Sequence, residues 1–471
     1  MEQLYQERLA RYTTAMRNEK PDRVPVRPFA AEFITHLSGY TCQEVTHDYE
    51  KAFDATCKCA AEFDWDATVG NMVYVWTALT ETIGLRYYGV PGLNVPPDTG
   101  FQYLEPPEGE AWMKPDEYDA LIEDPTGFLF NVWLPRVSRD IVAPGEPATY
   151  RSHMALLKGG MAMLQYFGAL GAQGERLKQE TGTVSAIAGI FKAPLDILGD
   201  KLRGYMGLTM DLIEQPDKVL AACEALMPHL CAVASASADP ECNVPIGFWM
   251  HRGCVPFVSY EQFDRFYWPT LKPIIEELWK EGHQTLFYAE GDWNAHLDSF
   301  AELPDASIVY HVDRADIFEA HAKLGHKFCL SGGIPNYLLA YVTPEEVTAH
   351  CKKVIEGVAA DGGYVLDASA IMQNDSKVEN VRAMTEAARQ FGVYSDGHSR
   401  YARPVPENAG GVDGLQNAGR ATRIPPNTTV PWNEKRAEYG KMTGDEAIQK
   451  TVWEQIDALG YTFAWHCLVS F

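Results

Sequence analysis

The chain has 471 residues, of which 46% are hydrophobic and 22% are charged, a composition typical of a folded globular protein. Lys and Arg number 40 against 64 Asp and Glu, so the formal net charge is −24. This charge repels phosphate backbones and anionic membrane surfaces. We therefore expect neither a nucleic acid nor a membrane as a partner.

The compartment is inferred from the start of the chain and from its cysteines. The first residues carry no apolar signal core, and no segment reads as one of the roughly 20-residue apolar runs that span a bilayer. The ten cysteines are scattered without the density of a disulfide scaffold, so reduced thiols are expected. Together these features predict a cytoplasmic protein.

Short apolar runs rich in β-branched or aromatic residues alternate with amphipathic helical patterns. Two helices carry capping boxes, one starting at Ser259 and one at Thr343. The expected strands are Arg23 to Pro28, Asp66 to Val69, Val184 to Phe191, Asn243 to Met250, Gln284 to Glu290, Ser307 to Val312, Lys327 to Leu330 and Gly363 to Asp367. Because no Gly-x-Gly-x-x-Gly turn follows any strand, this α/β alternation predicts a (β/α)8 TIM barrel and not a doubly wound sheet.

Two further segments surround the expected barrel. Residues 72–182, between the second and third strands, are too many for a loop, so we expect a helical insertion over the barrel mouth. Within it, residues 91–107 are rich in Pro and Gly and indicate a lid or turn cluster. The barrel is expected to span residues 1–394, and residues 395–471 to form a C-terminal extension packed on it.

Candidate functional residues are sought where the strands end, because parallel barrels carry their sites there. Tyr288 and Glu290 are two residues apart in one strand and so point to the same side. The next strand ends with His311, and a carboxylate and an imidazole on neighbouring strands can converge on one ion. With Asp367 as third ligand, Glu290 and His311 predict zinc or another divalent ion with an open position. The other polar strand-end residues are Glu32 and His251, and a hydrogen-bonded structural role is the alternative for each.

Several segments in this order resemble the uroporphyrinogen decarboxylase superfamily over roughly residues 5–394. They are residues 20–26 (KPDRVPV), 262–269 (QFDRFYWP), the turn at 332–338, residues 342–347 (VTPEEV) and residues 379–384 (ENVRAM). That superfamily folds as a (β/α)8 barrel, and the resemblance implies the same fold here. It contains porphyrinogen decarboxylases and cobalamin-dependent methyltransferases.

The sequence departs from the patterns of two branches of this superfamily, the porphyrinogen decarboxylases and the thiol methyltransferases. The decarboxylases follow the first strand with Met-Arg-Gln-Ala-Gly-Arg, whose arginines hold substrate carboxylates, whereas residues 26–32 here read VRPFAAE. The thiol methyltransferases bind zinc through His-x-Cys and a later Cys, where this chain has Tyr288-Ala-Glu290 and Asp367. Carboxylates in place of thiolates resemble the substrate-activating methyltransferases of O-demethylase systems.

Those methyltransferases have a pattern similar to Glu-x14-Glu-x20-His. Glu290 and His311 match the second half of this pattern in spacing. The first position falls on Ile275, with Glu276 one residue away, so Glu276 is the alternative to Asp367 as third ligand.

The resemblance implies transfer of a methyl group from a methoxylated, aromatic substrate to the Co(I) of a separate corrinoid protein, which supplies the cobalamin. The metal would act as a Lewis acid on the ether oxygen. His251 and Tyr288 are the expected catalytic hydrogen-bond donors, and with Glu32 they are the expected substrate-binding residues. A decarboxylase or lyase acting without a corrinoid, and a non-catalytic small-molecule-binding barrel, are the alternatives. The sequence leaves open a methylamine, thioether or quaternary ammonium substrate, and whether the chain forms a homodimer.

Overall fold

The structure is a computed structural model that describes residues 1–70, 74–107, 109–399 and 423–470. The start of the expected insertion at Met72 and residues 400–422 of the expected extension lie outside the described residues. The ten cysteines are all described and free, as the sequence predicts.

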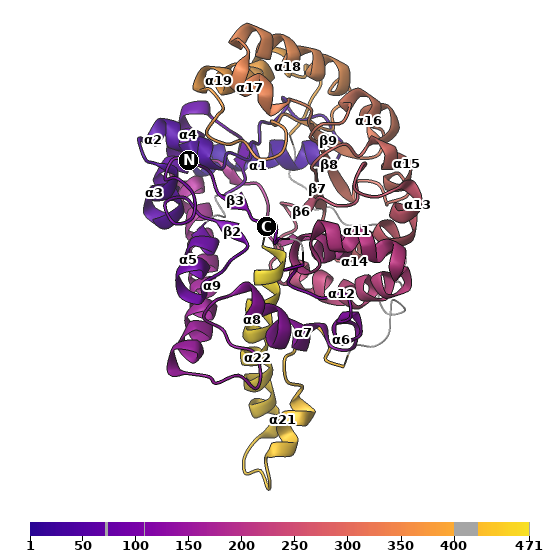
Figure 1. Ribbon diagram of the computed structural model, residues 1–471. Coiled ribbons are helices and arrows are strands. Elements are labelled where there is room, and N and C mark those ends of the chain that lie inside the picture. Colours follow the sequence, from indigo (N-terminus) through magenta and orange to yellow (C-terminus); the bar gives the residue numbers. More distant parts are fainter. Residues whose placement is uncertain (71–73, 108, 400–422, 471) are drawn as a thin grey trace.

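The core is a parallel (β/α)8 barrel, which confirms the predicted fold class (Figure 1). Six strands form one sheet in the order β10-β9-β8-β7-β6-β5. They are β5 (Ile190–Phe191), β6 (Ile246–Met250), β7 (Thr285–Ala289), β8 (Ile308–Val312), β9 (Cys329–Gly332) and β10 (Tyr364–Val365). Closure comes from Val26 in the first expected strand, which bridges to Leu366, while its carbonyl accepts the backbone N–H of Ala67.

The expected strand from Val184 to Phe191 is split in two. Its first half, β4 (Val184–Ser185), pairs with β1 (Ala67–Thr68), whereas its second half, β5, pairs with β6. Between them the chain leaves the ladder, and Gly189 has a φ of +80°, a region that glycine adopts without strain. The barrel wall is therefore interrupted on this side.

Helices surround the strands and follow the predicted alternation. The capping box at Ser259 begins α13 (Tyr260–Gln262), which continues as a π-helical turn, η5 (Phe263–Tyr267). The box at Thr343 begins α18 (Pro344–Val358), so both predicted starts are confirmed. The other helices of the barrel region are α1 (Glu2–Met16), η1 (Glu32–Ile34), α2 (Thr35–Ser38), α3 (Cys42–His47), α4 (Tyr49–Phe63), α10 (Pro194–Ile197), η4 (Leu198–Leu202), α11 (Gly204–Glu214), α12 (Pro216–Ala236), α14 (Trp268–Lys280), η6 (Asn294–His296), α15 (Leu297–Phe300), α16 (Ile317–Leu324), α17 (Asn336–Tyr341) and α19 (Val378–Phe391).

The region expected as an insertion is mostly helical and adds one short antiparallel pair of strands. Its elements are α5 (Tyr74–Ile83), β2 (Tyr88–Gly89), β3 (Gln102–Tyr103), α6 (Tyr118–Glu123), α7 (Pro125–Phe128), η2 (Leu129–Trp133), α8 (Leu134–Val137), α9 (Tyr150–Arg176) and η3 (Leu177–Thr181). The helix α9 packs along α5 and against α4 and α22. The hairpin of β2 and β3 lies beside the barrel mouth, where it contributes to the site described below.

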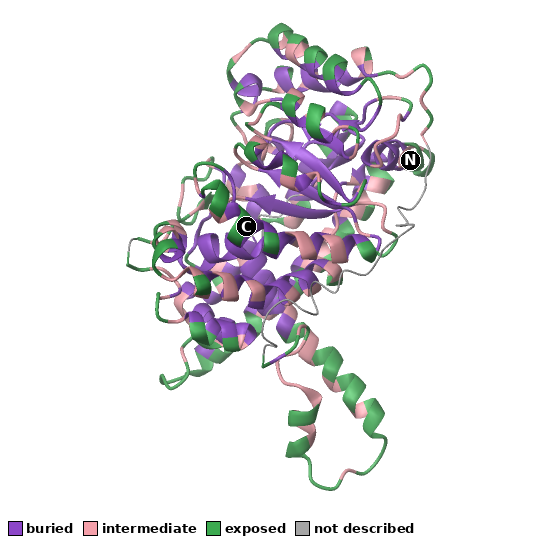
Figure 2. Cartoon of the chain, turned by 90° about the vertical axis from the view of Figure 1, so that its right-hand side faces the viewer, coloured by how far each residue is buried: buried purple, intermediate pink, exposed green. Residues whose placement is uncertain are grey.

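The C-terminal region consists of α21 (Trp432–Glu438) and α22 (Glu446–Val469). The last turns of α22 are buried against α7, α9 and α12. There the ring of Trp465 stacks on His229 with a centroid separation of 4.6 Å. The first half of α22 and α21 project from the body of the molecule, with exposed side chains such as Ile448 and Ile456 (Figure 2).

One described helix contradicts the expectation that no segment is long and apolar enough to cross a membrane. The helix α12 meets that test, with a mean hydropathy of 1.6 over its most apolar window. However, 61% of this window is buried, and α12 packs against α6, α14 and β5. Its apolar composition is thus accounted for by its place in the core of the fold.

Candidate active site at the barrel mouth

Charged side chains gather at the carboxyl ends of three neighbouring strands. Lys192 follows β5, His251 follows β6 and Glu290 follows β7. Asp200 reaches the same place from η4, the π-helical turn that continues α10. Because the carboxyl ends of parallel strands share one edge of the sheet, these groups meet at the barrel mouth.

Asp200 is the centre of this rim cluster, defined here as Lys192, Asp200, His251, Arg252 and Glu290. Its Oδ2 lies 2.6 Å from His251 Nδ1 and accepts from Lys192 Nζ at 3.0 Å, while its Oδ1 accepts from Arg252 Nε at 2.6 Å. On the opposite side of the imidazole, His251 Nε2 lies 3.5 Å from Glu290 Oε2. The side chain of Asp200 is buried, whereas those of His251 and Glu290 are 22% and 31% exposed. The imidazole therefore links a buried carboxylate to the open side of the mouth.

The electrostatics of the rim favour a charged imidazole. Burial and the charge of Lys192 lower the pKa of His251, but Asp200 and Glu290 outweigh them and raise it to about 9. Burial raises the pKa of Asp200, yet Lys192, His251 and Arg252 hold it well below its usual range. At neutral pH the mouth presents an imidazolium with Nδ1 held by Asp200 and Nε2 turned toward Glu290. Such a group can act as a general acid.

A second carboxylate fixes the end of β6. Asp196 accepts the backbone N–H of Arg252 at 2.5 Å and the hydroxyl of Tyr267 at 3.0 Å. Burial and the nearby charge of Asp200 raise the pKa of Asp196 to about 6. These bonds tie the residue after His251 to α10 and to η5, so the imidazole is positioned by three elements at once.

The hairpin of the insertion contacts one side of the mouth. The hydroxyl of Tyr103 donates to the backbone carbonyl of Asp200. Farther along, Glu105 Oε2 lies 3.7 Å from Arg252 Nη2. Residues 91–107, expected to form a lid or turn cluster, thus include residues that touch the rim cluster directly.

Glu32 lies apart from the rim cluster, beneath the same hairpin. Its Oε1 accepts the backbone N–H of Phe101 at 3.2 Å, while Oε2 has no hydrogen-bond partner among the described residues. Burial raises the pKa of Glu32 to about 7. A Cβ added at Gly100 would lie 3.1 Å from the carboxyl carbon of Glu32, so the glycine lets the hairpin approach closely. The structure therefore places this predicted substrate-binding residue under the insertion.

A second polar network lies deeper in the barrel and forms the floor beneath the rim. Arg27 Nη2 donates to Asp367 Oδ2 at 2.8 Å and to Ser331 Oγ at 3.0 Å. His311 Nδ1 lies 3.0 Å from the same Ser331 Oγ. The ring of Tyr288 lies 4.6 Å from the ring of His311 and 5.5 Å from the guanidinium carbon of Arg27. All five residues are at most 1% exposed.

Burial dominates the protonation of the floor. It raises the pKa of Asp367 to about 7, although the charge of Arg27 opposes this shift. Burial and Arg27 together lower the pKa of His311 well below its usual value, so the imidazole is neutral. Tyr288 Oη, His311 Nε2 and Asp367 Oδ1 have no hydrogen-bond partners within the part of the chain that the structure describes. These three atoms are the hydrogen-bonding capacity that the floor leaves unused.

The predicted metal ligands Glu290, His311 and Asp367 do not form one site. The ladder between β7 and β8 pairs His311 with Tyr288, so Glu290 lies two residues farther along, at the rim. His311 Nδ1 and Asp367 Oδ2 do lie close together, 3.7 Å apart. However, the guanidinium of Arg27 bonds this Asp367 oxygen and lies 3.4 Å from His311 Nδ1, so a cation already contacts both atoms. Across the described ranges, no three His, Cys, Asp or Glu side chains are placed to hold a metal ion. The arrangement does not fit the expected zinc site.

Sequence reasoning missed several residues of the rim. Lys192 directly follows one expected strand and Arg252 lies two residues beyond the end of another, and these positions were a usable signal for both. Asp200 lies nine positions beyond Phe191, the end of the split strand, on a π-helical turn that no sequence pattern identified. Glu276, the alternative metal ligand, lies on α14, which packs on the outside of the barrel.

The fold and the rim together define a (β/α)8-barrel protein with a cluster of acid, base and cationic groups at the strand ends. Residues 144–391 match the family described as uroporphyrinogen decarboxylase (URO-D). This match covers more than half of the chain, and the protein belongs to the URO-D family.

One solved structure with the same fold is a methyltransferase from Methanosarcina mazei. Its sequence is 16% identical, the TM-score is 0.54, and the match covers 82% of this chain and 98% of that chain. At this identity the likeness concerns the fold. No curated protein matches the sequence.

Proposed function

We propose that this URO-D family member is a methyltransferase. The proposal is supported by the family, by the fold that it shares with the Methanosarcina mazei methyltransferase, and by the proton donor at the rim. In its specific form, the methyl group of a methoxylated aromatic substrate passes to a separate corrinoid protein, whose Co(I) supplies the methyl acceptor.

The observation that carries the proposal is the charged His251 between Asp200 and Glu290. Breaking the bond between the methyl carbon and the ether oxygen leaves the electron pair on oxygen. The phenolate that departs needs a proton or another positive charge. The imidazolium Nε2–H of His251 donates its proton to that oxygen, so the phenol leaves neutral and the imidazole becomes neutral.

The neighbours of His251 hold it ready for this step. Asp200 fixes the ring through Nδ1 and keeps it protonated before the substrate arrives. Lys192 and Arg252 compensate the charge of Asp200, so the proton is not held too tightly to be given up. Glu290, which is part exposed, lies beside Nε2 and can pass a proton from solvent back to the ring. The proposal contains no step through zinc, because Glu290 lies apart from His311 and Asp367, and the guanidinium of Arg27 contacts both of these side chains.

The test is an anaerobic assay of cob(I)alamin consumption with a panel of methoxylated phenols and benzoates. Wild-type protein is compared with His251→Asn and with the control His153→Asn, which changes an exposed residue on α9. We expect His251→Asn to lower the rate by roughly 10²- to 10⁴-fold, the range of general acid catalysis, and His153→Asn to leave it unchanged. Failure of the whole panel, or full activity of His251→Asn, would overturn the proposal.

The family description favours a second candidate, a decarboxylase or lyase of a small carboxylic acid. The rim does hold two cations, Lys192 and Arg252, that could attract a carboxylate. Each is already bonded to Asp200, and the deeper Arg27 is bonded to Asp367. Release of carbon dioxide from a carboxylic acid in the absence of any corrinoid would favour this candidate.

A further inference from the structure

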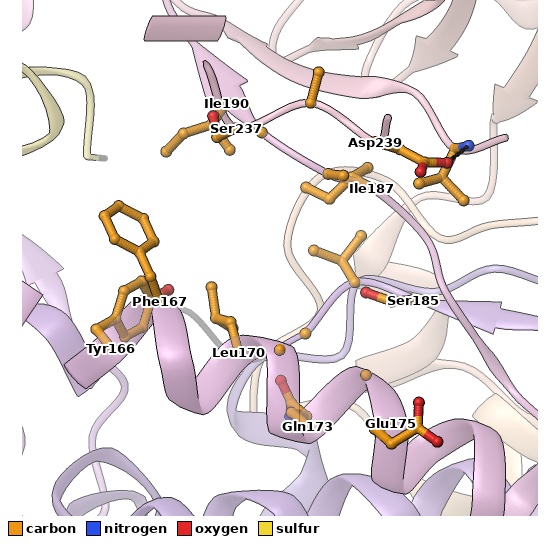
Figure 3. A pocket seen from close by; sticks show the side chains of 18 of the residues that line it. Tyr166, Phe167, Leu170, Gln173, Glu175, Ser185, Ile187, Ile190, Ser237 and Asp239 are labelled. Carbon is orange, nitrogen blue, oxygen red and sulfur yellow. Dashed lines mark hydrogen bonds between the residues drawn. The ribbon is translucent and has the colours of Figure 1, made fainter. Parts of the chain in front are cut away.

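A cavity of about 620 Å³ lies beside the barrel, at the break in the split strand. One wall is α9, from which Phe167, Leu170 and Gln173 face the cavity. The opposite wall is the split strand, with Ile187 between β4 and β5 and Ile190 at the start of β5 (Figure 3). This volume falls in the range of small-molecule sites. None of the rim residues lines the cavity, so it is separate from the mouth.

The sequence explains why the space is open. The break between β4 and β5 removes the ladder that would otherwise bring the barrel wall toward α9. On α9 itself, Gly171 and Gly174 line the cavity. A Cβ built at Gly171 would meet no atom within 4 Å, and one at Gly174 would meet only Ser185, at 3.8 Å. Small residues on one wall and an interrupted strand on the other thus leave room for a ligand.

One end of the cavity is aromatic and carries two unused hydrogen-bonding atoms. The side chain of Tyr166 is 5% exposed, and its hydroxyl has no hydrogen-bond partner among the described residues. His466, at the end of α22, is also 5% exposed and packs edge-on against Phe167 at 4.7 Å. Its Nε2 likewise lacks a partner among the residues described.

The tautomer of His466 follows from its surroundings. Burial lowers its pKa to about 4, so the ring is neutral at physiological pH. Its Nδ1 lies 2.9 Å from the backbone carbonyl of Thr462, which can only accept, so the single proton sits on Nδ1. The Nε2 atom is therefore an acceptor that no described residue satisfies, and a ligand hydroxyl can supply the donor.

Charged groups at the other end of the cavity are engaged with the protein. Asp239 accepts backbone N–H groups of Glu241, Asn243 and Val244, and Lys178 pairs with Glu2 at 3.1 Å. The walls between the two ends are largely aliphatic and aromatic. A neutral ligand suits this lining better than an ionic one, because a buried charge needs an unengaged partner.

We propose that this cavity, called here the side cavity, is a binding site for a neutral aromatic molecule that carries a hydroxyl group. The ring packs between Leu170 of α9 and Ile187 or Ile190 of the split strand, and the hydroxyl donates to His466 Nε2. Tyr166 supplies a second hydrogen bond to the same end of the ligand. This site is independent of the rim cluster and of the function proposed for it.

The probe is 2-naphthol, compared with 2-methylnaphthalene, which has the same shape and no hydroxyl. Binding to the full chain is measured by equilibrium dialysis for the wild type, Leu170→Trp and His466→Phe. Leu170 is half-buried, so a larger ring there fills the side cavity without entering the core. His466→Phe keeps the packing against Phe167 and removes the acceptor. Glu290→Gln, at the rim, is the control outside the side cavity.

We expect saturable binding of 2-naphthol, weakened about ten-fold or more by Leu170→Trp and unchanged by Glu290→Gln. The wild type should prefer 2-naphthol over 2-methylnaphthalene by roughly five- to ten-fold, the effect of one buried hydrogen bond. His466→Phe should lose this preference. Equal binding of both probes by the wild type, no saturable binding, or binding unaffected by Leu170→Trp would overturn the proposal, whether or not His466→Phe folds.

Discussion

Tyr288 and His311 are register partners on β7 and β8, with their rings 4.6 Å apart. This pairing separates the polar groups of the barrel into two layers. His311 joins Arg27 and Asp367 in the buried floor, whereas Glu290, two residues beyond Tyr288, reaches His251 at the rim. The floor is closed to solvent and the rim is partly open to it, so the two layers have different consequences when their charges are changed.

We expect a large loss of stability when one partner of the buried ion pair between Arg27 and Asp367 is removed. Arg27→Met leaves the carboxylate of Asp367 buried without its cation, and we expect the free energy of unfolding to fall by about 3–5 kcal/mol at pH 8. The measurement is equilibrium urea denaturation. The double variant Arg27→Met with Asp367→Leu removes both charges and should recover much of the loss. A double variant as unstable as Arg27→Met alone would contradict this account of the floor.

The rim predicts a change in the pH dependence of activity. Methyl transfer needs the protonated His251, whose pKa is about 9. The rate should therefore be constant well below pH 9 and fall as the pH rises through this value. Asp200→Asn removes the carboxylate that raises this pKa most, so the falling limb should move down by about two pH units. The measurement is the pH profile of kcat/KM for methyl transfer.

Glu290→Gln is the matched variant for this profile. This variant removes the more distant and more exposed of the two carboxylates that face His251. The falling limb of the pH profile should therefore also move to lower pH, by less than in Asp200→Asn. Circular dichroism of both variants establishes that they are folded. A limb that stays in place in Asp200→Asn would mean that His251 is not the titrating acid.

The barrel fold could be predicted from the sequence, but the strand register that places the residues of the candidate site could not. The alternation of strands and helices and both capping boxes follow from local patterns, because alternation and capping involve residues close together in the chain. The break in the expected strand from Val184 to Phe191 was not predicted, because it depends on which neighbouring strand each half pairs with. The pairing of Tyr288 with His311 is set by the ladder of two strands, which spacing along the chain does not determine. Arg27 reaches Asp367 and His311 because the first expected strand closes the barrel against the last one. Choosing candidate residues only at the ends of strands could therefore not predict a cation beside the expected metal ligands.

The buried carboxyl group of Glu32 should make the stability of the protein depend on pH, and Glu32→Gln should remove this dependence. Burial raises the pKa of Glu32 to about 7 from an ordinary value of 4.5, so between these values the folded state retains a proton that the unfolded state releases. Stability therefore falls as the pH rises from about 4.5 to 7, by about 3 kcal/mol in total. Glu32→Gln should match the wild type at pH 4.5 and exceed it at pH 8 in urea denaturation. The exposed control Glu7→Gln should show no such difference, and equal curves for Glu32→Gln and wild type at pH 8 would refute the assignment.

The two tryptophans of α22 predict which part of the C-terminal region stabilises the barrel. Trp465 is fully buried, stacks on His229 of α12 and donates its Nε1–H to Thr126 Oγ1 at 3.1 Å. Trp453 lies in the projecting half, where its Nε1–H donates to the carbonyl of Val430. Because Trp465→Ala opens a cavity between helices of the main body, it should cost about 3–5 kcal/mol in urea denaturation. Trp453→Ala should cost less than about 1 kcal/mol, since it leaves the body untouched. Similar losses for both variants would mean that the projecting half contributes to the stability of the barrel as much as the buried half.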